Sequence, residues 1–193
     1  MKLKKKTIKA AAIILIAALL IAAGYMLMQN NKKNVEVVLE TSEGNITIEL
    51  YSDMPVTAGN FQKFVGEGLY DGVLFHRVID RFMIQGGDPL TKDPTKKAEW
   101  GTGGPGYTIR DEFTHAGGNK NNRGTISMAN SGPNTGGSQF FINLVNNNFL
   151  DSRHPAFGEV IDGMDVVDAI AKVQTDQNDL PIEDVKVIRA TIK

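Results

Sequence analysis

The sequence of 193 residues contains no cysteine, which excludes disulfide bonds, thiol nucleophiles and zinc held by thiolates. Its three histidines, His76, His115 and His154, lie far apart and lack the spacing of metal ligands. The sequence also has no Walker A loop, no HExxH motif and no GxSxG nucleophile elbow. We therefore expect no metal and no cofactor, and no motif supports a nucleotide hydrolase, a metalloprotease or a serine hydrolase.

Acidic residues dominate the chain once its first residues are set aside. Residues 1–28 carry five lysines and no acid, which leaves 16 of the 21 lysines and arginines against all 22 aspartates and glutamates. An acidic domain is unsuited to nucleic acid, because neutralisation of phosphates dominates that affinity. The 20 glycines predict many tight turns, as in an all-β protein.

The first 28 residues have the pattern of a membrane segment. Ala10–Met28 is 19 residues without a charge, nearly enough for a helix to cross a hydrocarbon core of about 30 Å. The preceding lysines predict a cell-membrane location, single-pass, with the domain on the extracytoplasmic side. The apolar run exceeds that of a signal peptide, so we favour a retained anchor, with cleavage and secretion as the alternative. Residues 29–34 would be a linker and residues 35–193 the folded domain.

Short apolar and β-branched segments dominate residues 35–193. Val35–Thr41 and Ile46–Tyr51 flank a Ser-Glu-Gly-Asn turn and predict a β-hairpin. Helices are expected at 55–67 and 165–173, and further strands at 73–79, 82–86, 124–129, 138–143, 156–161 and 185–193. Many short strands with glycine-rich turns predict an all-β sandwich or closed barrel. The loop-rich segment 87–122 is long enough to be functional.

Two weaker patterns are set aside. Gly101-x-Gly103-x-x-Gly106 fits the dinucleotide fingerprint by letter, but no clear strand precedes it and Pro105 with a β-like segment follows in place of a helix. Ser138 and His154 could form a hydrolase triad with an aspartate, but no nucleophile elbow surrounds the serine. Neither nucleotide binding nor hydrolysis is expected.

Three longer blocks carry a resemblance to a known family. They read FHRVIDRFMIQGGD at 75–88, SMANSGPNTGGSQFFI at 127–142 and FLDSRHPAFGEV at 149–160. In order and approximate spacing they resemble cyclophilin-type peptidyl-prolyl cis/trans isomerases, of a bacterial type with an N-terminal membrane anchor or signal. The resemblance runs from about Val35 to Lys193. It implies a closed eight-stranded antiparallel barrel capped by two helices, and an enzyme that turns X–Pro bonds in exported proteins.

The expected reaction breaks amide resonance, against a barrier of about 18–20 kcal/mol, and cleaves no bond. A site needs an apolar slot for the proline ring and a donor for the imide nitrogen, whose lone pair is localised only in the twisted state. The resemblance makes Arg77 that donor, since its guanidinium is a permanently charged fork of N–H groups. It places Phe82 and Gln85 in the same catalytic set, with Gln85 holding the arginine and the substrate carbonyl.

The resemblance also implies which residues bind the substrate. They form the proline pocket and its rim (Met83, Phe141, Phe149 and Leu150), hold the peptide backbone (Ala129, Asn130 and Gln139) or stand at the pocket edge (His154). Many eukaryotic cyclophilins have a tryptophan where this sequence has Phe149, so the indole N–H is lost and cyclosporin binding is predicted to be weak. Strand alternation further predicts that Phe75 and Arg77 share one face.

Two functional interpretations remain open. In the first, the chain is an isomerase that speeds proline-limited folding. In the second, the same groove is a non-catalytic binding module or chaperone for proline-containing segments. A pure binder would not need a cation at the imide nitrogen, so the polar set around Arg77 favours the enzyme. The expected partners are proline-containing polypeptides, and the membrane through the N-terminal segment, but not nucleic acid.

Overall fold

The computed structural model describes residues 34–193. The expected membrane or signal segment at 1–28 lies outside the described residues, as does most of the linker expected at 29–34. Among the residues that are described, no helix combines the length and the apolar character needed to cross a membrane.

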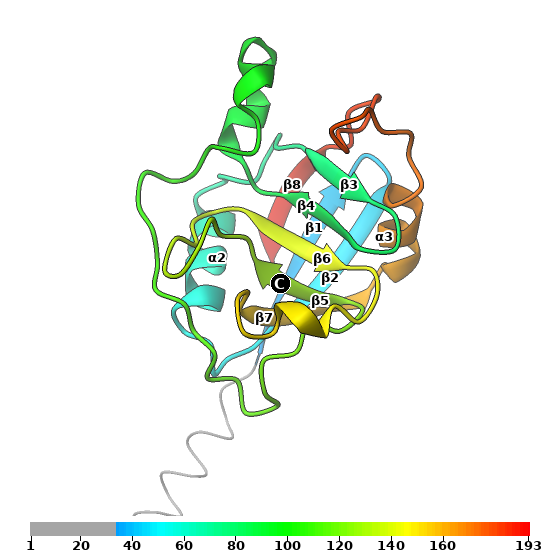
Figure 1. Ribbon diagram of the computed structural model, residues 1–193. Helices are drawn as coiled ribbons and strands as arrows, with labels where there is room; N and C mark the ends of the chain where they lie inside the picture. Colours follow the sequence, from blue (N-terminus) through cyan, green and yellow to red (C-terminus); the bar gives the residue numbers. More distant parts are fainter. Residues whose placement is uncertain (1–33) are drawn as a thin grey trace, which may run out of the picture. The chain divides into compact units, whose positions relative to one another are not determined.

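Residues 34–193 contain eight strands that form one antiparallel sheet (Figure 1). The strands are β1 (Val35–Thr41), β2 (Gly44–Leu50), β3 (Arg77–Ile79), β4 (Met83–Gly86), β5 (Thr125–Met128), β6 (Phe140–Asn143), β7 (Ala156–Asp162) and β8 (Val187–Ile192). β1 and β2 form the predicted hairpin, whose turn depends on Gly44 at a φ of +134°. Only glycine adopts such a backbone readily, which explains its place in the Ser-Glu-Gly-Asn turn.

The strands follow the order β3-β4-β6-β5-β7-β2-β1-β8, so β3 and β8 stand at the two ends. The closed barrel that the resemblance implies is therefore not shown, and the sheet is a half-barrel. The chain before β3 nevertheless meets the start of β8, where Gly72 N donates to Val187 O at 2.7 Å and Val187 N donates to Val73 O at 2.8 Å. Because residues 72–75 hydrogen-bond toward β8, β3 is shorter than the strand predicted at 73–79.

Two α-helices lie within the described residues, α2 (Thr57–Gly66) and α3 (Met164–Ile170), close to the predicted ranges. The N-terminus of α2 has no side-chain cap from Val56. Buried Glu112 instead accepts hydrogen bonds from Val56 N and Thr57 N at 3.0 and 2.8 Å. Its carboxylate satisfies two free donors and meets the positive end of the helix dipole.

The main hydrophobic core joins one face of the sheet to both helices. Phe61 of α2 contacts the rings of Tyr70, Phe140 and Phe157, with centroids 4.9, 5.4 and 5.3 Å away. α3 contributes Val167 and Ile170, which are fully buried. In Figure 1, α2 lies to the left of the strands and α3 to their right. This apolar burial is the main stabilising contribution to the fold.

Three short 3-10 helices complete the described part of the chain, η1 (Pro89–Lys92), η2 (Pro94–Glu99) and η3 (Asn148–Leu150). η1 and η2 form the arm that projects from the body in green in Figure 1. Both begin with an Asp-Pro pair: Asp88 accepts from Leu90 N at 2.8 Å and Asp93 from Thr95 N at 2.9 Å. Aspartate caps and prolines fit a first turn, so the sequence defines both starts.

Candidate active site

Strand register brings the expected catalytic polar residues side by side. Arg77 of β3 pairs with Gln85 of β4, Gln85 pairs with Phe141 of β6, and Phe141 pairs with Ser127 of β5. Residues directly opposed on neighbouring strands point to the same face of a sheet. The guanidinium, amide and phenyl groups therefore share the face that points away from the main core, here called the outer face.

The intervening residues point the other way, into the main core. Val78, Ile84 and Ile142 belong to that core and none is more than 2% exposed. The prediction that Phe75 shares a face with Arg77 is wrong, because Phe75 is 1% exposed and lies in the same core. Phe75 precedes β3, so the alternation of that strand does not extend to it.

A second, smaller apolar cluster lies on the outer face. Its members are Met83, Phe141 and Leu150, which are buried, and Ile79, Phe82 and Ala129, which are partly buried. Phe149 stands beside it with 68% of its surface exposed, and its ring stacks on Phe82 with centroids 6.1 Å apart. The structure thus brings together the residues predicted for the pocket and its rim. Such a site suits a small apolar ring.

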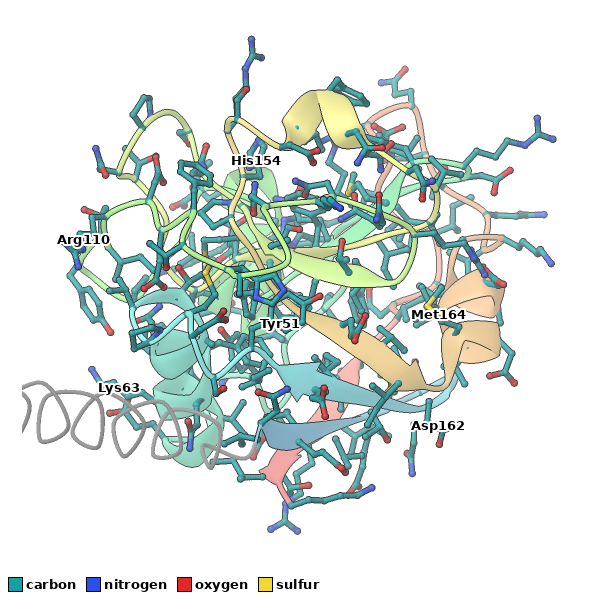
Figure 2. The ribbon with its side chains drawn as sticks, turned by 90° about the horizontal axis from the view of Figure 1, so that it is seen from below. Tyr51, Lys63, Arg110, His154, Asp162 and Met164 are labelled. Atoms are coloured by element: carbon teal, nitrogen blue, oxygen red, sulfur yellow. The ribbon has the colours of Figure 1, made fainter. Side chains whose placement is uncertain are left out.

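His154 stands at the edge of this pocket. Its ring meets Phe141 edge-on, with centroids 5.4 Å apart. Its Nδ1 lies 3.0 Å from Met128 O, and since a carbonyl only accepts, Nδ1 carries the proton. Nε2 is left as the ring nitrogen available to a ligand. In Figure 2, His154 lies beside η3 and well away from Lys63 of α2 and Met164 of α3.

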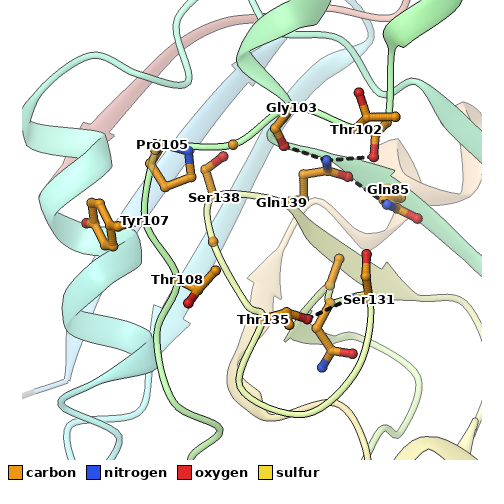
Figure 3. Close-up of a pocket in the computed structure, with 16 residues that line it drawn as sticks. Gln85, Thr102, Gly103, Pro105, Tyr107, Thr108, Ser131, Thr135, Ser138 and Gln139 are labelled. Atoms are coloured by element: carbon orange, nitrogen blue, oxygen red, sulfur yellow. Dashed lines mark hydrogen bonds between the residues drawn. The ribbon is translucent and has the colours of Figure 1, made fainter.

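Gln85 and Gln139 form a hydrogen-bonded pair next to the pocket. Gln85 Nε2 donates to Gln139 Oε1 at 3.0 Å, and Gln139 Nε2 donates to the carbonyls of Gly101 and Gly103 at 2.9 and 2.8 Å (Figure 3). Both N–H groups of Gln139 are thereby used. Gln139 fixes the loop after the arm, while Gln85 keeps one N–H and its carbonyl oxygen without a partner among residues 34–193.

A cavity of about 610 Å³ adjoins this pair (Figure 3). It lies between residues 101–108 and residues 129–139, and it shares Gln85, Ala129, Asn130 and Gln139 with the site. Its lining combines glycines with hydroxyl and amide side chains and with Pro105 and Ala129, and none of these side chains is charged. The arrangement suits a neutral group that extends from a ligand held over the apolar pocket.

Arg77 is held on the side away from Gln85. Its side chain is 45% exposed, and its Nε lies 3.6 Å from the Asp179 carboxylate, in an ion pair. Gln85, which the resemblance implies would hold the arginine, instead bonds to Gln139. The distal nitrogens of Arg77 donate no hydrogen bond within residues 34–193, which leaves their N–H groups available to a ligand.

Asn130 links the site to a smaller neighbouring cavity. Its Nδ2 donates to Arg153 O at 2.8 Å and its Oδ1 accepts from Gly132 N at 3.3 Å, which leaves one N–H without an acceptor in the described part of the chain. The cavity, about 430 Å³, is lined by Asp111, Asn130, Arg153 and His154 among others. Ala129 is fixed through its backbone, since its N–H donates to Gln139 O at 3.0 Å.

A buried asparagine network supports the pocket, and the sequence analysis did not identify it. Asn143 is fully buried and its Nδ2 lies 3.0 Å from Thr125 Oγ1 and 3.3 Å from Ser127 Oγ. Asn147 donates to Asn143 Oδ1 and to Phe82 O, both at 2.9 Å. The network ties β5 and β6 to the chain that carries Phe82. The run of asparagines at 146–148 was the one available signal.

Beneath the loop at Gly101 lies His76, which the motif also contains. Both of its ring nitrogens are buried without a hydrogen-bond partner within residues 34–193. Burial lowers the pKa of His76, and buried Asp88 opposes that shift. Asp88 itself accepts from Gly103 N at 3.1 Å and so fixes the same loop. Among residues 34–193, no three side chains gather into a candidate metal site.

Comparison with known proteins places this geometry in a family. The model described as "Cyclophilin type peptidyl-prolyl cis-trans isomerase/CLD" matches residues 36–192. The peptidyl-prolyl cis-trans isomerase ppi1 of Schizosaccharomyces pombe is 46% identical over 162 residues, which are 81% of this chain and 97% of that protein. CYP71 of Arabidopsis thaliana is 46% identical over 157 residues, but this chain spans only 24% of its length.

A crystal structure is similar along nearly its full length. It is a Cryptosporidium parvum cyclophilin type peptidyl-prolyl cis-trans isomerase, determined in the presence of the dipeptide Ala-Pro. It is 32% identical with a TM-score of 0.73, and the match covers 82% of this chain and 98% of that one. The likeness supports the arrangement of the strands and two helices.

The same comparisons correct two expectations. These similar proteins are eukaryotic, so the bacterial type with an N-terminal anchor is not shown. The predicted localisation at a cell membrane is contradicted, since the matching proteins are eukaryotic cyclophilins and no helix of residues 34–193 could span a membrane. Residues 1–28, on which that prediction rested, lie outside the described residues.

Proposed function

The chain belongs to the family of cyclophilin-type peptidyl-prolyl cis-trans isomerases, and we propose that it turns X–Pro bonds on the outer face of β3, β4 and β6. The observation that carries this assignment is the cross-strand row Arg77–Gln85–Phe141. It sets a cation, an amide and an apolar ring side by side, next to buried Met83 and Leu150. Rotation about a peptide bond needs these groups and no nucleophile.

Arg77 would supply the transition-state contact. In the planar ground state the imide lone pair is delocalised and accepts poorly, whereas in the twisted state it is localised. A donor aimed at that nitrogen therefore binds the transition state more strongly than the ground state. The distal N–H groups of Arg77, which donate no hydrogen bond to any of the described residues, support this role. The proline ring would rest on Phe141, Met83 and Leu150, with Phe82 and Phe149 as its walls.

Gln85, Asn130 and His154 would hold the client backbone. Gln85 and Asn130 each keep one N–H, and His154 keeps Nε2, without a hydrogen-bond partner within residues 34–193. Gln139 has no N–H left, so its role would be to fix the loop at Gly101 and Gly103 and to orient Gln85. This differs from the direct backbone contact expected of Gln139. The cavity of about 610 Å³ would take a neutral client side chain adjacent to the proline.

The test is cis-to-trans isomerisation of a short X–Pro peptide by residues 30–193, beside Arg77→Ala and Arg77→Lys. Loss of a donor that acts only in the transition state typically costs about 10²–10³ in rate. Arg77→Lys keeps the positive charge but lacks the planar set of guanidinium N–H donors. We therefore expect its isomerisation rate to lie between those of Arg77→Ala and the wild type. Near-ultraviolet circular dichroism checks that each variant keeps its tertiary packing.

The outcome also separates the two interpretations. If the folded wild type accelerates rotation and Arg77→Ala does not, the groove is catalytic and residues 30–193 suffice for the activity. If the wild type binds X–Pro peptides without accelerating rotation, the groove is a proline-segment binding module, and the catalytic assignment of Arg77, Phe82 and Gln85 is refuted.

A further inference from the structure

We infer that Asp179 is a positioning residue for Arg77, an inference that rests on the catalytic role proposed above. Asp179 belongs to the segment between α3 and β8, about a hundred residues from Arg77 in the chain. Its carboxylate lies 3.6 Å from Arg77 Nε, and this is the ion pair that Arg77 forms within residues 34–193. Asp179 lies outside the three motif blocks, and the resemblance gave it no role.

The segment around Asp179 is a turn that is held by hydrogen bonds between its own residues. Asp176 Oδ1 accepts from Asn178 N at 2.8 Å and from Leu180 N at 3.1 Å, and Asp176 N donates to Leu180 O at 2.8 Å. Asp179 sits at its tip with a φ of +63°, in the left-handed region. Aspartate and asparagine tolerate that region better than other residues that carry a β-carbon. The turn therefore presents the Asp179 side chain in a defined direction.

A backbone hydrogen bond fastens this turn to β3. Val78 N donates to Asp179 O at 2.8 Å, directly after Arg77 in the chain. β3 is the end strand of the sheet, so this turn occupies the edge that no other strand covers. Arg77 thus has Gln85 across the strand on one side and Asp179 on the other. The turn is placed to act on Arg77 and on no other residue of the row.

The geometry of the ion pair leaves the reactive end of the arginine free. The nearest contact of the carboxylate is to Nε, the nitrogen nearest the chain, and neither distal Nη group donates a hydrogen bond within residues 34–193. Restraining Nε limits rotation of the guanidinium plane while both Nη groups can still donate to a client. Such pre-organisation lowers the entropic cost of reaching the transition state. Both side chains are nearly half exposed, so the effect is modest.

The experiment is a double-mutant cycle on the isomerisation rate. Asp179→Asn removes the charge but keeps a residue suited to the left-handed backbone, where alanine would add strain. We expect kcat/KM to fall about twofold to fivefold, in line with a partly exposed ion pair. In the Arg77→Ala background the same substitution should change nothing, because the group it positions is gone. Raising the salt concentration should shrink the effect by screening the pair.

A matched control comes from the same segment. Asp184 is exposed and forms no ion pair within residues 34–193, so Asp184→Asn makes the same charge change without touching Arg77. It should leave kcat/KM unchanged. An equal loss in Asp179→Asn with and without Arg77 would overturn the inference, as would an unchanged or raised rate in the single variant. An inactive wild type would instead refute the proposed function itself.

Discussion

Phe140 and Phe141 are consecutive residues of β6 whose side chains point to opposite faces of the sheet. Substituting Phe140 should therefore mainly lower stability, and substituting Phe141 should mainly lower activity. Phe140 is fully buried in the main core, where it contacts the rings of Phe61, Tyr70 and Phe75. Phe140→Ala leaves a cavity in that core and should cost about 3–5 kcal/mol of unfolding free energy. Phe141 belongs to the small outer cluster beside the groove.

Phe141→Ala should cost less stability and more activity. The space it vacates opens to the groove, so the loss should approach the transfer value of one side chain, about 1.5–3 kcal/mol. The proline ring, however, loses the floor of its pocket. Truncation of an apolar pocket typically costs about 1–3 kcal/mol of discrimination, or about 10–200-fold in kcat/KM.

The assay pairs urea unfolding with X–Pro isomerisation for both variants, at a temperature where each is folded. We expect Phe140→Ala to have the lower urea midpoint and near wild-type kcat/KM, and Phe141→Ala to have the lower kcat/KM. A Phe141→Ala enzyme with the wild-type rate would refute the assignment of the pocket. A Phe140→Ala enzyme that is folded but equally inactive would show that the two faces are not independent.

Three further predictions concern residues outside the row. Glu112→Gln should lower the thermal midpoint, because the carboxylate that receives Val56 N becomes a weaker acceptor; a lost cap costs about 0.5–2 kcal/mol, and an unchanged midpoint would contradict the capping role. Hydrogen bonds from Arg123 hold the pKa of Asp168 below its ordinary value of 3.8. That stabilisation is present above the ordinary pKa and lost as pH falls through the lowered one, so acid unfolding of Asp168→Asn should depend less on pH below about 5. Phe149→Trp should tighten cyclosporin binding by restoring an indole N–H, as titration calorimetry would measure; tight binding by the wild type would refute the predicted weakness.

Short sequence patterns predicted those strands and turns whose conformation depends mainly on neighbouring residues. The β1–β2 hairpin follows from β-branched strands and the glycine at its turn. The arm was not predicted, since the sequence indicated only a loop-rich segment at 87–122, although both of its 3-10 helices begin with an Asp-Pro pair. The pocket residues could be named because they lie in contiguous motif blocks. Their placement on one face was only partly predictable, since Phe75 departs from the alternation of β3 where the chain turns toward β8.

Long-range polar contacts could not be predicted from the sequence. The acceptor that caps α2 is Glu112, and the anion beside Arg77 is Asp179; each meets its partner from a distant, irregular segment. The use of both Gln139 N–H groups by Gly101 and Gly103 depends on where the loop after the arm returns. No periodicity marks such contacts, because they are fixed by tertiary packing and not by secondary structure.

The way in which the two end strands of the sheet are covered affects how this protein can associate with other polypeptide chains. An exposed strand edge can recruit a strand from another chain and seed aggregation. Here Val78 N of β3 is taken by Asp179 O, and Val187 N of β8 by Val73 O, although the strand order is open. A catalyst that handles unfolded chains meets unpaired strands continually. By occupying its own end-strand donors, it can act on such chains without becoming the template for their association.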